Sequence, residues 1–138
     1  MASTASRYFF MFLVGLVMGA VLAVMGLRAL QARQDPFPDS VMHVMQKHSG
    51  LLAKTIEENR CAATDTAPHL RTLRAMTNDL EIAFPGLADD ERFRTHASPF
   101  RAKLDAGLST PPTECASAEK ISASIKESCK ACHQDFRS

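Results

Sequence analysis

The chain has 138 residues, which suits one domain of ordinary size, and its formal net charge is +1. Sixteen basic residues stand against 15 acidic ones, a balance that argues against a nucleic-acid-binding or polybasic surface. Beyond Arg28, β-branched residues and Gly are sparse, while Ala, Leu, Lys, Arg and Glu are common. This composition predicts that the part of the chain after Arg28 is all-α.

The amino-terminal segment is apolar and long enough to cross a bilayer. Residues 8–27 are 20 positions without a charge or a strongly polar side chain, and as a helix they would span roughly 30 Å. We therefore expect residues 1–28 to be a retained single-pass anchor in the lipid bilayer. A cleavable signal peptide is the alternative, although Leu30-Gln31-Ala32 is a poor small-x-small cleavage site.

Small residues recur along one face of this segment. Gly15, Gly19 and Ala23 form a small-xxx-small stripe that could let two anchors pack as a homodimer. The alternative is that the stripe reflects only the general abundance of Gly in membrane helices. Arg7 precedes the segment and Arg28 and Arg33 follow it, so charge gives only a weak indication of its orientation. By the positive-inside rule this small excess mildly disfavours placing the following domain outside the cytoplasm.

Residues 29–38 are expected to form a short polar linker that contains two Pro. A first helix is predicted from about Asp39 to Arg60, and a second from the Asp65 cap to the stop at Pro85-Gly86. The apolar positions expected on the core side of these two helices are Val41, Met45, Leu52 and Ile56, and then Leu70, Leu73, Thr77, Leu80 and Phe84.

The carboxyl-terminal half of the chain predicts two further helices. Pro99 interrupts the region 89–107, so Ser98-Pro99 is expected to start a new helix there. The last helix follows Thr113 and extends nearly to Ser138. Helices joined by short turns pack as antiparallel neighbours, so residues 39–138 are predicted to form an up-down-up-down four-helix bundle.

The sequence Cys129-Lys130-Ala131-Cys132-His133 carries the most specific chemical signal. C-x-x-C-H is the attachment pattern of a c-type haem: each thiol can add to one vinyl group, and the adjacent imidazole can ligate the iron as the proximal ligand. Three alternatives stay open: a zinc site, which lacks a second ligand pair; a thioredoxin-like redox pair, which lacks the strand-to-helix setting; and a plain structural disulfide.

A sixth iron ligand is expected from upstream, because only residues 134–138 follow His133. In an up-down bundle the end of the fourth helix lies beside the start of the first, where the sequence offers Met42, His43, Met45 and His48. If they do not bind iron, His43 and His48 are expected to lie on the helix surface or at its boundary with the core. His69 and His96 show no partner spacing and are expected to be solvated.

At these residues the chain resembles the class II c-type cytochromes, which comprise cytochrome c′ and its low-spin relatives with a His/Met haem. Residues 129–137 look like the closing C-x-x-C-H-x-x-Tyr-Arg pattern of that family, with Phe136 in place of the usual Tyr. Residues 41–48 look like its first-helix segment, although Pro38 stands where the family often has an Arg. The resemblance covers roughly residues 37–138, with specific motifs only at the two ends.

The resemblance implies one haem c per chain and places Met42 at the distal side of that haem, where low-spin members use a Met as ligand. Periodicity instead puts Met45 in the helix seam, so Met42, Met45, a His and no protein ligand remain alternatives, with Met42 first. Arg137 would lie near the haem if the resemblance holds. Otherwise it is a carboxyl-terminal cation favoured by the helix dipole.

Cys61 and Cys115 are predicted to meet at the opposite end of the bundle. Cys61 ends the first helix and Cys115 opens the fourth, so antiparallel packing brings both to the same end. A disulfide there could contribute roughly 4 kcal/mol in the chain-entropy model. Two buried free thiols are the alternative.

Three functions follow as hypotheses. The first is a membrane-anchored electron carrier, not an enzyme, whose haem domain lies in the periplasm on the bacterial inner membrane and whose partners are other redox proteins. The second is a five-coordinate haem that binds nitric oxide or carbon monoxide, as in cytochrome c′. The third is a membrane-bound dithiol oxidoreductase that uses Cys129 and Cys132.

Overall fold

A computed structural model of the chain describes residues 4–31 and 35–136, and these residues form six helices and no strand. The all-α prediction is therefore confirmed. The chain divides into two compact units, residues 1–36 and 37–138.

The first unit is built around α1 (Thr4–Gln31), which continues past the expected end of the anchor at Arg28. Between Ser6 and Gln31 this helix is long and apolar enough to cross a membrane, and none of its most hydrophobic window is buried within the structure. Its large side chains, from Tyr8 to Leu30, are exposed. A helix that is apolar all round and uncovered by protein is typical of a membrane span.

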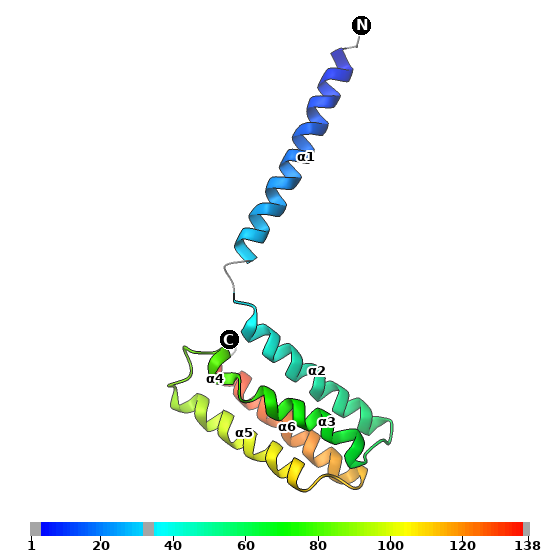
Figure 1. The fold of residues 1–138 in the computed structure, drawn as a ribbon, viewed down its shortest axis with the longest axis vertical. Coiled ribbons are helices and arrows are strands. Elements are labelled where there is room, and N and C mark those ends of the chain that lie inside the picture. The colour runs from blue at the N-terminus through cyan, green and yellow to red at the C-terminus, as the bar shows by residue number, and fades with distance from the viewer. Residues whose placement is uncertain (1–3, 32–34, 137–138) are drawn as a thin grey trace. The chain divides into compact units, whose positions relative to one another are not determined.

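The second unit contains five helices (Figure 1): α2 (Phe37–Glu57), α3 (Ala63–Met76), α4 (Leu80–Ala83), α5 (Glu91–Ser109) and α6 (Cys115–Phe136). The four long helices pack in a closed cycle, α2 on α3, α3 on α5, α5 on α6 and α6 on α2, and the short α4 also contacts α2. Each long helix runs back alongside the previous one (Figure 1). This is the up-down-up-down order that short connections favour.

The core of this unit is aliphatic. Five side chains from the four long helices are each no more than 2% exposed: Leu52, Leu70, Leu73, Leu104 and Ile125. Burying a side chain of this size stabilises a fold by about 1.5–3 kcal/mol. The core positions predicted for the first helix, from Val41 to Ile56, are all buried, as the helical periodicity requires.

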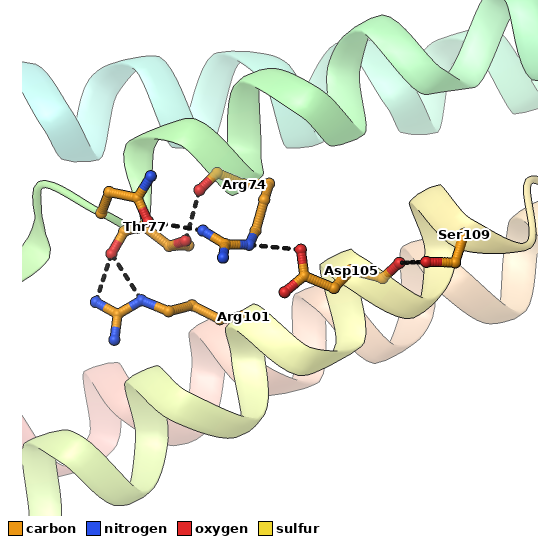
Figure 2. A network of polar contacts seen from close by, with 6 residues as sticks. Arg74, Thr77, Arg101, Asp105 and Ser109 are labelled. Atoms are coloured by element: carbon orange, nitrogen blue, oxygen red, sulfur yellow. Dashed lines mark hydrogen bonds and ion pairs between the residues drawn. The ribbon is translucent and has the colours of Figure 1, made fainter.

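The predicted second helix is broken, which corrects the sequence prediction of one helix up to Pro85. It begins at Ala63, before the expected Asp65 cap, and α3 ends at Met76 before α4 begins at Leu80. At the break the Thr77 carbonyl accepts hydrogen bonds from Arg101 Nε and Nη2 at 3.0 and 2.6 Å (Figure 2). This guanidinium on α5 satisfies a carbonyl that the helix end leaves without an intrahelical donor.

The prediction of a new helix at Ser98-Pro99 is wrong, because α5 runs unbroken through Pro99. The helix starts earlier, where Asp90 Oδ1 accepts a hydrogen bond from the Arg92 amide at 2.8 Å and caps the first turn. Pro99 cannot donate to the carbonyl of Thr95. Both residues are exposed, so water can reach that carbonyl and the helix continues.

Cys61 and Cys115 lie at disulfide distance. Their Sγ atoms are 1.99 Å apart and their Cα atoms 5.0 Å apart. Cys61 follows α2 and Cys115 opens α6, so the pair joins these two neighbouring helices at one end of the bundle. The predicted pairing is confirmed, and it leaves the amino-terminal end of α2 beside the carboxyl-terminal end of α6.

Candidate functional site

The last turns of α6 present two free cysteines on one helix face. Cys129 and Cys132 are three residues apart, which places their side chains on neighbouring positions of that face. Both are half-buried, and Cys129 also packs against the apolar core. The intervening Lys130 is exposed. The C-x-x-C pair therefore borders the core.

His133 follows the pair and is exposed on α6. In the part of the chain that the structure describes, its ring has no hydrogen bond, ion pair or ring contact. An exposed imidazole beside two thiols would be available to bind iron if a haem were attached there.

Burial raises the pKa of the Cys129 thiol above its ordinary value of 9.0. Burial also raises the pKa of Cys132, and the charges of Cys129 and Asp135 add to that effect. Both thiols are therefore protonated at neutral pH. A thiol that acts as a redox nucleophile has the opposite environment, in which nearby positive charge lowers the pKa.

The two candidate distal ligands differ in burial. Met45 is 8% exposed and belongs to the core, whereas Met42 is half-buried and packs against the core from outside. Both lie near the start of α2, which packs on α6. Because the disulfide marks the other end of these two helices, Met42 and His133 lie at the same end of the bundle.

Helix α5 holds the end of α6 through contacts that the sequence does not predict. The Phe136 ring meets Phe93 and His96 edge to face, with centroids 5.6 and 6.1 Å apart, and Arg92 Cζ lies 5.5 Å from its centroid. Asp135 Oδ2 lies 2.7 Å from His96 Nε2. These contacts fix the last turn of α6. Arg137, which the resemblance places near the haem, lies outside the described residues.

The expectation that His69 and His96 are solvated without partners is wrong. His96 pairs with Asp135, and His69 Nδ1 lies 3.2 Å from His48 Nδ1. The partners are 39 and 21 residues apart along the chain, so no local spacing marks them. Only the register of the packed helices brings them together.

The chemistry of the donor set fits a c-type haem. Attachment requires two thiols on one helix face with an available imidazole next to them, beside an apolar surface. Cys129, Cys132 and His133 meet the first two requirements, and the adjoining core meets the third. Among the described residues, no group of three or more His, Cys, Asp or Glu side chains could hold a metal ion.

Comparison with protein-family models, curated proteins and solved structures finds no match to this chain.

Proposed function

We propose that the protein is a membrane-anchored c-type cytochrome that carries electrons through one covalently attached haem. The observation that carries the proposal is the face of α6, where Cys129 and Cys132 lie half-buried at the edge of the core beside the exposed ring of His133. The resemblance of both ends of the bundle sequence to class II c-type cytochromes supports the same function.

When bound, the haem supplies an iron that gains or loses one electron. The Sγ atoms of Cys129 and Cys132 would each form a thioether, with the thiol hydrogen passing to the vinyl group, so no atom is lost. His133 would bind the iron on the proximal side.

Met42 is the better distal candidate of the two methionines. Met45 fills the core at 8% exposure, and withdrawing it toward a haem would leave a cavity among its neighbours. Met42 is already at the edge of the core, at the His133 end of the bundle. A Met thioether together with a His imidazole would raise the reduction potential of the iron and keep its ligand set fixed, which suits electron transfer.

The location belongs to the same proposal. The apolar helix α1 supports anchorage in the bacterial inner membrane, and the Cys61–Cys115 pair supports an oxidising compartment, the periplasm, for the bundle. The partners would be other redox proteins at the membrane, met through small transient contacts.

The test is the absorption spectrum of the ferrous full-length protein with and without carbon monoxide. The proposal predicts sharp low-spin bands that carbon monoxide leaves unchanged. It also predicts that Met42→Ala converts the iron to a high-spin, carbon-monoxide-binding form, while Met45→Ala keeps the low-spin bands.

Each contrary result has a defined meaning. A wild-type protein that binds carbon monoxide directly would be a gas-binding haem protein with no distal protein ligand. A Met42→Ala spectrum equal to that of the wild type would remove Met42 from the ligand set. A colourless protein with a reducible Cys129–Cys132 bond would be the dithiol oxidoreductase, against which the raised thiol pKa values already argue.

A further inference from the structure

A pair of histidines joins α2 to α3 away from the cysteines. His48 and His69 are both half-buried, and their Nδ1 atoms lie 3.2 Å apart. Their ring centroids are 5.4 Å apart and their planes are inclined by 56°. The two nitrogens therefore face each other across the helix interface.

Neither ring has another hydrogen bond or an ion pair in the described part of the chain. Burial lowers the pKa of His69 below its ordinary value of 6.5, and the charges of His48 and Arg60 lower it further. His69 is thus neutral at pH 7. A neutral imidazole carries its proton on either ring nitrogen, and placing that proton on Nε2 leaves the Nδ1 lone pair free to bind a metal ion.

The separation of the nitrogens matches that of two ligands on one metal ion. With Zn–N bonds of about 2.0–2.1 Å, two tetrahedral ligand atoms lie about 3.3 Å apart. The terminal torsion of His is broad, so a modest rotation of each ring would aim both lone pairs at a common point. Imidazole nitrogen is also a preferred ligand of zinc and copper.

We propose that His48 and His69 form a two-histidine site for a divalent transition-metal cation of the zinc and copper class, with water completing the coordination. The site would cross-link α2 and α3. His48 is one of the upstream residues that could supply a sixth iron ligand, but the haem proposal assigns that position to Met42 and uses neither His48 nor His69. The zinc or copper site is therefore separate from the haem proposal.

The nearby charges do not prevent cation binding. Arg60 is the cation that acts on His69, and its guanidinium lies 2.7 Å from Glu58 and 4.0 Å from Asp65. These two carboxylates balance the Arg60 charge. The site is also half-buried, so water molecules can reach the open coordination positions.

The experiment is a calorimetric titration of the full-length protein in detergent with Zn²⁺ alone, at a pH above 7. His48→Gln and His69→Gln should each bind one zinc ion fewer than the wild type, or bind it about tenfold more weakly or worse. His43→Gln is the matched control, because His43 is an exposed histidine on the same helix and its removal should leave the zinc stoichiometry unchanged.

Nitrogen-15 NMR of the wild-type imidazoles provides a measurement that does not depend on the folding of any variant. Zinc should shift the Nδ1 resonances of both His48 and His69. The proposal is overturned if millimolar Zn²⁺ leaves these resonances in place, or if both glutamine variants retain the wild-type stoichiometry. If the haem proposal fails, zinc could instead bind the free thiols of Cys129 and Cys132. That binding would persist in both glutamine variants, so a failure of the haem proposal can be distinguished from a failure of the two-histidine site.

Discussion

Arg101 on α5 holds the junction between α3 and α4 through two different acceptors. Besides the Thr77 carbonyl (Figure 2), its Nη2 bonds the carboxylate of Glu81 on α4. Burial acts to raise the pKa of Glu81, but hydrogen bonds from Arg101 and the backbone outweigh it and place this pKa below its ordinary value of 4.5. The charged form of Glu81 is therefore favoured in the folded state.

This pKa shift predicts a contribution to acid sensitivity. Since the folded-state pKa lies below 4.5, Glu81 stabilises the fold above pH 4.5 and loses that contribution as the pH falls through the folded-state value. Glu81→Gln should lower the free energy of unfolding near pH 7 and make it fall less steeply below pH 4.5 than in the wild type. Urea unfolding at a series of pH values measures this.

The matched control is Glu57→Gln, at an exposed carboxylate of α2. It should reproduce the wild-type acid dependence. An acid dependence that is the same in Glu81→Gln and in the wild type would mean that the Arg101 contact does not act on stability through this carboxylate.

Some residues of the candidate site can be predicted from the sequence, and others cannot. The C-x-x-C-H residues are contiguous and their chemistry is visible in the sequence alone. His96 with Asp135 and His48 with His69 depend on the register between different helices, which no local pattern encodes. The preference for Met42 over Met45 likewise came first from resemblance, and the difference in their burial adds a physical reason.

At the scale of elements, Pro99 tests whether α5 is one helix. Its ring removes a hydrogen bond from the helix interior, a change that costs up to about 3 kcal/mol relative to Ala. Pro99→Ala should therefore raise the free energy of unfolding, because the position is exposed and no packing is lost. Chemical denaturation measures the change.

Pro68 on α3 provides a comparison, because it is also exposed inside a helix. Pro68→Ala should be stabilising for the same reason. A clear loss of stability in Pro99→Ala alone would indicate that Ser98-Pro99 does start a separate helix, as the sequence pattern suggested.

The helices were predictable where hydrophobic periodicity is strong and less so where tertiary contacts decide. The core face of α2, from Val41 to Ile56, follows directly from its spacing. The break after Met76 was not foreseen, because the apolar pattern continues through Leu80 and the ending is secured by Arg101 from another helix. The Pro99 prediction failed because the rule against interior Pro is weaker on a solvent-exposed face.

At the scale of the whole molecule, the Cys61–Cys115 pair closes the bundle over a separation of 54 residues. In the chain-entropy model a cross-link of this length stabilises the folded state by roughly 4 kcal/mol. Cys61→Ser combined with Cys115→Ser should lower the free energy of unfolding by about that amount, as measured by denaturation of the full-length protein in detergent.

The double variant should also retain the haem spectrum while it is folded, because the pair lies at the end of the bundle away from His133. The wild type reduced with dithiothreitol should have the same free energy of unfolding as the double variant. A double variant as stable as the oxidised wild type would contradict a stabilising role for the cross-link.

The central claim is that haem is bonded covalently to Cys129 and Cys132, and the most direct test is denaturing chromatography of the full-length protein from a host that matures c-type cytochromes. The visible haem absorption should elute with the polypeptide after acid-acetone extraction, and its intact mass should exceed that of the chain by one haem. Cys129→Ser combined with Cys132→Ser should remove both signals. A wild-type chain that elutes colourless, with both thiols free or joined to each other, would contradict the proposed function.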